Sequence, residues 1–254
     1  MRAFSRPLAV AIAAVSLVAL PSVSRAQTFS PEQRSEIQRV IKDYLISNPE
    51  VLQEAIGELE KRQAAAEAER NKASLVKNRD LLINSPRQVV LGNPQGDVTL
   101  VEFFDYNCGY CKRAMVDMLE LIKADPKLRI VLKELPILGE ESLEAAQVAV
   151  AVRMQDKAGT RYLDFHQKLF ANRGRLGKAQ ALAAAKASGA DMARIEKDMQ
   201  SSEIAATVEE GLQLAQSLGI NGTPGYVIGD TVVAGAIGVP ALRQQIQKIR
   251  AGKS

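Results

Sequence analysis

The chain has few of the residues that structural cysteine frameworks and metal sites require. Its 254 residues include two cysteines, one histidine and no tryptophan. A structural zinc site takes four cysteine or histidine ligands, and a disulfide-stapled secreted domain takes several cysteine pairs. Both classes are therefore disfavoured, and we expect no metal site. The cysteines, Cys108 and Cys111, form a single Cys-Gly-Tyr-Cys motif.

A large charge excess is also missing. The 33 basic and 29 acidic residues give a formal net charge of +4, and three of the arginines lie in the first 26 residues. These 26 residues have two basic residues near their start, continue with an apolar run over 8–20 and finish with a small-residue cleavage site at 24–26, an order typical of a signal peptide. The apolar run is too short for a permanent membrane span. Cleavage after Ala26 would leave 30 basic against 29 acidic residues, so we expect no nucleic-acid partner.

Export would place the two cysteines in an oxidising compartment, where disulfides form and persist. Residues 98–104 are rich in β-branched and aromatic types, which predicts a buried strand, and 112–123 have helical spacing. The motif therefore lies where a strand ends and a helix begins. Sulfurs at i and i+3 of a first helical turn can bond with little backbone movement. The free N–H groups and dipole of the helix start lower the pKa of a cysteine there.

Three other interpretations of the motif are weaker. A structural disulfide closing so short a loop stabilises little, because it removes little entropy from the unfolded chain. A zinc half-site would need two further ligands, and His166 is the only other candidate of these types. Two inert buried cysteines would not need this placement. The pattern favours a reversible redox disulfide.

The region before the motif is predicted to be helical and different in character. Ser30-Pro31 and Asn48-Pro49 are two helix starts, and 61–74 is almost entirely polar, which indicates an exposed stalk. Each start precedes an apolar stripe: Ile37, Val40, Ile41, Tyr44 and Leu45, then Val51, Leu52, Ala55, Ile56 and Leu59. Helices this short need a partner surface. They could pack on the main domain, but we favour self-association between chains.

The remaining pattern predicts an α/β domain. A strand at 88–92, the strand and helix around the motif, and a strand at 129–135 include a right-handed βαβ unit with parallel strands. Five helices (141–158, 160–172, 178–188, 191–199 and 201–218) precede a hairpin of strands 226–228 and 231–233 and a last helix, 239–251.

This order resembles the DsbA-like branch of the thioredoxin fold, and the segments FFDYNCGYCK and NGTPGYVI carry the likeness over about 85–254. The N-terminal extension resembles the ScsC-type subgroup (suppressor of copper sensitivity), whose members include trimeric disulfide isomerases. We therefore expect a signal peptide at 1–26, an N-terminal helical oligomerisation and linker region at 27–84, and a thioredoxin-fold domain at 85–254 with a helical insertion at about 140–218.

The resemblance also implies roles for individual residues. Cys108 would be the exposed nucleophile and Cys111 the buried resolving thiol. Pro224 falls on the family's cis-proline, whose loop faces the cysteines, and Thr223 would offer its backbone to an extended substrate.

Glu102, six residues before Cys108, matches the buried acid of the fold, with Lys133 on the next strand as its expected partner. Burial should raise the pKa of this carboxyl, which could relay protons to the resolving thiol. The alternative is a plain internal ion pair.

The chain departs from the family between its cysteines. Gly109 and Tyr110, which we place with Thr223 and Pro224 on the substrate-binding surface, replace the Pro-His of strongly oxidising members. Tyr110 cannot supply positive charge to a thiolate as a protonated histidine could, so strong oxidising power does not follow from the likeness. His166 is expected on a helix of the insertion.

These features lead to one hypothesis with three alternatives. We expect a periplasmic protein disulfide isomerase or reductase that needs no cofactor beyond the Cys108–Cys111 disulfide. Its partners would be protein substrates, a membrane redox protein that recycles the motif, and further copies of the chain, with a trimer favoured. The alternatives are a monomeric DsbA-type dithiol oxidase, a protein that handles Cu(I) with the dithiol, and a helical protein with an incidental motif.

Overall fold

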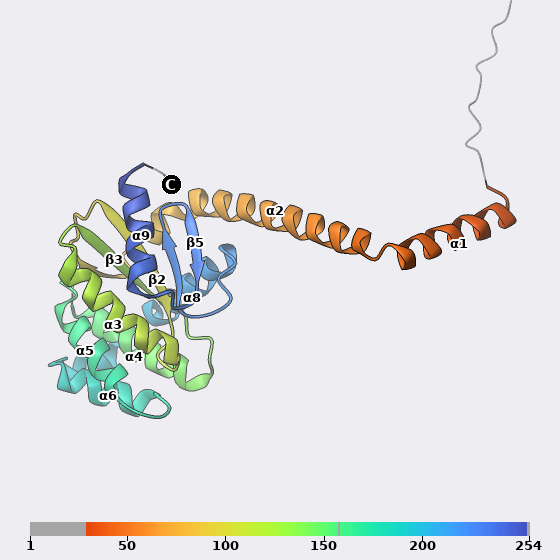
Figure 1. Ribbon diagram of the computed structural model, residues 1–254. Coiled ribbons are helices and arrows are strands. Elements are labelled where there is room, and N and C mark those ends of the chain that lie inside the picture. The colour runs from red at the N-terminus through yellow and green to blue at the C-terminus, as the bar shows by residue number, and fades with distance from the viewer. Residues whose placement is uncertain (1–28, 157, 253–254) are drawn as a thin grey trace, which may run out of the picture. The chain divides into compact units, whose positions relative to one another are not determined.

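The computed structural model describes residues 29–156 and 158–252 (Figure 1). The predicted signal peptide, 1–26, lies outside them. The helices are α1 Pro31–Ser47, α2 Glu50–Ile83, α3 Gly109–Ala124, α4 Glu140–Met154, α5 Thr160–Ala171, α6 Lys178–Ala187, α7 Met192–Asp198, α8 Ser202–Ser217 and α9 Gly238–Arg250. The strands are β1 Val89–Gly92, β2 Val98–Phe104, β3 Leu128–Glu134, β4 Gly225–Ile228 and β5 Thr231–Ala234. No helix among the described residues is both long enough and apolar enough to cross a membrane.

The two N-terminal helices begin at the predicted starts. Ser30 caps α1, accepting a hydrogen bond from the Gln33 backbone N–H at 3.3 Å, while the Gln33 side chain accepts one from the Ser30 N–H at 2.9 Å. This reciprocal pair satisfies two N–H groups that a helix start leaves free. The predicted apolar stripes are largely exposed in the single chain; Val40 is 57% and Ile56 55% exposed.

The chain divides into two compact units after Glu60, well before the predicted boundary at 84/85. The C-terminal part of α2 belongs to the larger unit, because Leu75 and Leu82 are buried in a cluster with residues of the sheet and of α8. Leu75 and Leu82 are seven residues apart, which places them on one face of the helix. The end of the predicted oligomerisation and linker region, 27–84, therefore belongs to the larger unit: the exposed polar stretch ends near residue 74, and a docked helical segment follows.

The sheet has the order β1-β3-β2-β4-β5. β2 and β3 are parallel, as the βαβ prediction requires, and the other pairs are antiparallel. Within the parallel pair, Glu102 lies opposite Leu132 and Phe103 opposite Lys133. Since successive side chains point to opposite faces of a sheet, this register decides which residues can meet beneath the cysteines.

Each face of the sheet has its own core. Leu100, Phe104 and Ile130 belong to the cluster that includes α3, α9 and the insertion helices. Val101, Phe103 and Val131 belong to the cluster that includes α2 and α8. α8 approaches β3 very closely: a Cβ added at Gly211 would lie 2.2 Å from the Glu134 carbonyl oxygen, so only glycine fits there.

Candidate active site

Cys108 caps the start of α3, directly after the loop that follows β2. Its sulfur lies 3.4 Å from the Cys111 backbone nitrogen, which donates to it, and 3.1 Å from the Thr223 carbonyl oxygen. Both cysteines are free thiols; Cys108 is 7% and Cys111 1% exposed. Cys111 is buried, as predicted, whereas Cys108, which was predicted to be exposed, is also buried in the reduced protein because the Thr223 loop covers its sulfur.

The surroundings of Cys108 favour its thiolate. Together they lower the pKa of Cys108 to about 5. The largest cause is a hydrogen bond from the Cys111 side chain, and burial opposes the lowering. Hydrogen bonds from the Thr223 side chain and from the N–H groups of Cys111 and Tyr110 lower the pKa further. The Thr223 carbonyl acts in the opposite sense, because it accepts a hydrogen bond only from the protonated thiol. Burial raises the pKa of Cys111 far above its ordinary value, and its hydrogen bond to Cys108 adds to this.

The predicted substrate loop lies against Cys108. The Thr223–Pro224 peptide bond is cis, and the Thr223 carbonyl is the group that contacts the sulfur. Gly109 and Tyr110 are exposed beside it. Tyr110 is 60% exposed, and the Arg113 guanidinium carbon lies 4.4 Å from the centre of its ring. The motif, the Thr223 loop and an open surface thus meet at one point.

Glu102 is buried near both sulfurs. Burial is the main reason that its pKa rises to about 8, and the charges of Asp117 and Cys108 add to the rise. Tyr226 lies directly opposite Glu102 across the antiparallel β2–β4 pair and is also buried. Burial, and then the charge of Glu102, raise the pKa of Tyr226 well above its ordinary value. Sequence reasoning missed Tyr226; the hairpin alone did not show which of its side chains faces the cysteines.

The predicted pairing of Glu102 with Lys133 is wrong. The Lys133 ammonium donates to Glu210 Oε1 at 2.9 Å and to the Leu81 carbonyl at 2.7 Å. In the β2–β3 register Lys133 lies opposite Phe103 rather than Glu102, so its side chain points to the other face of the sheet. Burial lowers the pKa of Lys133, and its contact with Glu210 opposes this. Lys133 therefore holds α2 and α8 against the sheet.

Asp105 and Asn107, which sequence reasoning did not single out, hold the loops around Cys108. The Asp105 carboxylate accepts hydrogen bonds from the N–H groups of Asn107, Ile137 and Leu138 and from the Ser142 hydroxyl, at 2.7–3.0 Å. The Asn107 amide bonds both the N–H and the carbonyl of Leu176, at 2.8 and 3.0 Å. Two polar residues at the end of an apolar strand were the signal that could have pointed to them.

His166 lies on α5 in the insertion, as predicted. Its Nδ1 is 3.0 Å from the Tyr106 hydroxyl, which is 3.2 Å from the Tyr162 hydroxyl; Tyr162 in turn donates to Glu134 at 2.7 Å. Burial lowers the pKa of His166 to about 3. The imidazole is therefore neutral within a buried chain of hydrogen bonds, and it supplies no positive charge to Cys108.

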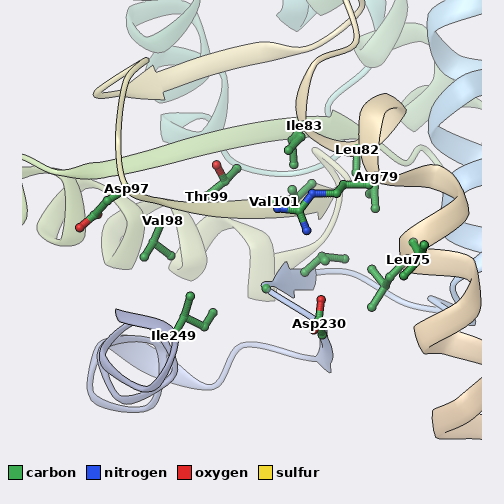
Figure 2. Close-up of a pocket in the computed structure, with 13 residues that line it drawn as sticks. Leu75, Arg79, Leu82, Ile83, Asp97, Val98, Thr99, Val101, Asp230 and Ile249 are labelled. Carbon is green, nitrogen blue, oxygen red and sulfur yellow. The ribbon is translucent and has the colours of Figure 1, made fainter. Parts of the chain in front are cut away.

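A cavity of about 150 Å³ lies at the opposite end of β2 from the cysteines (Figure 2). Leu75, Arg79 and Leu82 of α2 face Val98 and Val101 across it. Its lining contains no cysteine, so it is separate from the redox motif. Over the described ranges, no three His, Cys, Asp or Glu side chains group to hold a metal ion.

Two family models match the chain. The DSBA-like thioredoxin domain covers residues 99–247, and the Copper resistance protein ScsC N-terminal domain covers 33–66. The first includes Cys108, Cys111 and the Thr223 loop. The second covers both apolar stripes in full.

Solved structures and curated proteins give the same likeness. A thioredoxin-like oxidoreductase from Silicibacter pomeroyi is 43% identical, with a TM-score of 0.65, over 68% of this chain and 98% of that one. A linker-deletion mutant of Proteus mirabilis ScsC is 29% identical, with a TM-score of 0.67, over 89% and 99%. Disulfide bond formation protein D of Bacillus subtilis is 28% identical over 65% of this chain and 78% of its own length. The chain also matches a Na⁺/H⁺ antiporter of Salinispora arenicola at 24% identity over 67% of its length, but spans only 26% of that protein.

Proposed function

The chain belongs to the DSBA-like thioredoxin domain family of thiol–disulfide oxidoreductases, and we propose that it is an oligomeric disulfide isomerase or reductase acting on exported proteins. The observation that carries the proposal is the contrast within the motif. The pKa of Cys108 is lowered to about 5, whereas that of Cys111 is raised by burial. One sulfur is therefore ready to attack, and the other stays protonated.

In the first step, the Cys108 thiolate attacks one sulfur of a substrate disulfide. A Cys108–substrate S–S bond forms, the substrate S–S bond breaks, and one substrate cysteine leaves as a thiolate. The Thr223 backbone lies beside Cys108, which supports a role for it in pairing with the extended substrate segment.

Two outcomes follow. In isomerisation, another substrate thiolate attacks the mixed disulfide, a new substrate S–S bond forms, and Cys108 leaves as a thiolate without net redox change. In reduction, the Cys111 sulfur attacks Cys108. The substrate departs with both thiols, Cys111 gives up its proton, and the motif is oxidised by two electrons. A dithiol membrane partner would then reduce it again.

The N-terminal stripes support an oligomer. They are exposed in the single chain, and the region matches the ScsC N-terminal model. Pairing the stripes between chains would bury them, and several active sites near one substrate would raise the effective concentration for repeated attack. We propose a homotrimer in the periplasm, with the first 26 residues removed on export.

Deleting residues 27–60 tests this proposal. The remaining chain keeps Leu75, Leu82 and the whole sheet, so it retains both cores. We expect the full mature protein to be a trimer by light scattering and to restore activity to a scrambled disulfide substrate. The deletion variant should be a monomer that still reduces a simple disulfide but no longer restores the scrambled one. A monomeric full-length protein would contradict the proposal.

The low pKa of Cys108 also favours a second candidate, a dithiol oxidase. A stabilised thiolate stabilises the reduced motif and so makes the disulfide more oxidising. Trapping thiols in cells separates the two functions: a mostly reduced motif supports the isomerase or reductase, and a mostly oxidised motif supports the oxidase. The match that carries the copper-resistance name covers 33–66, which contains no cysteine, so it does not favour a copper site at the dithiol.

A further inference from the structure

We propose that a basic rim beside Cys108, formed by Lys112, Arg113 and Arg173, favours substrate segments that carry acidic residues next to the reacting cysteine. This inference rests on the proposed exchange function and adds a substrate preference to it. All three side chains are exposed, and none of them forms an ion pair with another described residue. Their charges are therefore available to a partner.

The rim is fixed close to the sulfur by hydrogen bonds. Lys112 directly follows Cys111 and donates to the Asn172 carbonyl at 3.0 Å. Asn107, which directly precedes Cys108, bonds both backbone groups of Leu176. The loop over 172–176 is thus tied at both ends to residues that flank the motif. Arg173 lies between these two ties, so its backbone is held near the motif, and its side chain is exposed.

Arg113 is held by an aromatic contact rather than by an acid. Its guanidinium carbon lies 4.4 Å from the centre of the Tyr110 ring, a cation–π arrangement that keeps its five N–H donors free for a planar acceptor. A carboxylate matches that donor fork and can accept two hydrogen bonds at once. Tyr110 adds exposed apolar area beside it.

Some of the acids nearby are already engaged by other donors. Asp105 is buried and its oxygens are occupied by four donors. Glu141 pairs with Arg175 at 3.5 Å, and Glu144 accepts from the Lys178 N–H. Burial raises the pKa of Asp117, one turn after Arg113, and the Arg113 charge opposes this rise, so Asp117 offsets part of the charge of the rim.

Exposed Glu140 adds one further negative charge at the start of α4. The three basic side chains stand against Asp117, Glu140 and the Cys108 thiolate, so the preference for an acidic segment rests on the exposed donors of the rim and not on a net positive charge. A neutral or basic peptide would gain nothing from the rim, and an acidic one would.

The test uses the full mature protein and three short peptides that differ only beside one cysteine, with Asp, Asn or Lys as neighbours. Each peptide carries its cysteine as a mixed disulfide with neutral 2-thiopyridine. Cys108 attack releases 2-thiopyridone, so absorbance reports the rate. Charges about 8 Å apart in water change a rate roughly twofold to threefold per pair, so we expect the Asp peptide to react about three to six times faster than the Asn peptide at low salt. This ratio should fall towards one at high salt.

The variant R113Q/R173Q should lose most of the Asp-to-Asn ratio. The matched control K123Q removes an exposed charge at the far end of α3, more than a Debye length of about 10 Å away along a helix that rises about 1.5 Å per residue, and should keep the ratio. Comparing ratios between variants cancels the intrinsic chemistry of each peptide. Equal Asp and Asn rates, or a ratio that survives R113Q/R173Q, would overturn the inference. Failure with all three peptides would instead contradict the exchange function.

Discussion

The ionisation of Cys108 gives the most direct test of the site. A lowered pKa of about 5 means that half of Cys108 is thiolate at pH 5. A free cysteine with a pKa of about 8.5 is then only about 0.03% thiolate, roughly 1,600-fold less. Nucleophilicity falls with pKa by about 0.45 log units per unit, so each Cys108 thiolate reacts roughly 40-fold more slowly. The net advantage is about 40-fold at pH 5 and nearly disappears at pH 7.

Alkylation of the reduced protein across pH 4–9 measures this advantage. The rate should rise with a midpoint near 5, and at pH 5 it should exceed that of a free cysteine peptide by about 40-fold. Buried Cys111 should stay unmodified in the same samples. A midpoint near 8.5 would refute the reasoning, and an advantage that appears only at pH 7 would mean that something other than ionisation speeds the reaction.

Two substitutions test the cause of the shift. The Cys111 side chain is the largest influence on the pKa of Cys108. Cys111→Ala removes that donor, whereas Cys111→Ser keeps a hydroxyl in its place. The midpoint for Cys108 should therefore rise further in the alanine variant than in the serine variant. Identical midpoints would mean that the helix start and its N–H groups, rather than the neighbouring side chain, set the ionisation.

The same shift makes the stability of the reduced protein depend on pH. The folded pKa of Cys108 is lower than the unfolded one, so this contribution is fully present above about pH 8.5 and is lost as the pH falls through about 5. The oxidised protein has no such titration. As the pH falls from about 8.5 to 5, the unfolding free energy of the reduced form should therefore fall relative to that of the oxidised form, as measured by urea unfolding.

Three further substitutions have defined outcomes. The pKa of Glu102 is raised to about 8, so the unfolding free energy of the wild type should fall as the pH rises from about 4.5 to 8. Glu102→Gln has no carboxyl to ionise, so this pH-dependent fall should be smaller by about 2–5 kcal/mol in urea unfolding. Glu210→Gln leaves the buried Lys133 ammonium without its counter-charge and should cost about 3–5 kcal/mol, which the double variant with Lys133→Met should partly restore. Gly211→Ala would place a Cβ 2.2 Å from a main-chain oxygen of β3 and should lower the unfolding free energy by at least about 1–3 kcal/mol. In the control Gly57→Ala the added Cβ meets nothing within 4 Å, so this variant should be neutral or stabilising in thermal unfolding.

Most of the fold could be predicted from the sequence because the patterns that indicate strands and helices are local. Alternating and helical spacing, with glycine and proline between the segments, predicted the strands and helices to within a few residues. The main difference is at one helix end: α4 stops at Met154 rather than 158. The packing of the end of α2 on the larger unit, which begins at Leu75, was not predicted. Leu75 and Leu82 follow a long polar stretch, and two leucines a heptad apart are a weak signal until the surface they contact is known.

The candidate site was predictable only where one segment contains it. Cys108 and Cys111 are placed by their own strand and helix, and the Thr223 loop came from family resemblance. The Glu102–Lys133 pairing failed because it depends on the register of two parallel strands. A shift of one residue sends a side chain to the other face, and no local pattern fixes that register. Tyr226, Asp105 and Asn107 were missed for the same reason, since their partners are distant in the chain.

The corrected position of Lys133 changes what Glu102 can do. A lysine beside Glu102 would keep that carboxyl ionised and ready to take the proton of Cys111. In its absence, a pKa of about 8 leaves roughly nine in ten Glu102 carboxyls protonated at pH 7. Cys111 is itself held as a thiol, chiefly by burial, and burial remains in a mixed disulfide, so we expect its attack there to have a poor base and to be slow at neutral pH. Slow resolution prolongs the mixed disulfide between Cys108 and its substrate. Under the proposed function, a second substrate thiolate would then have time to attack, which would favour isomerisation over simple reduction.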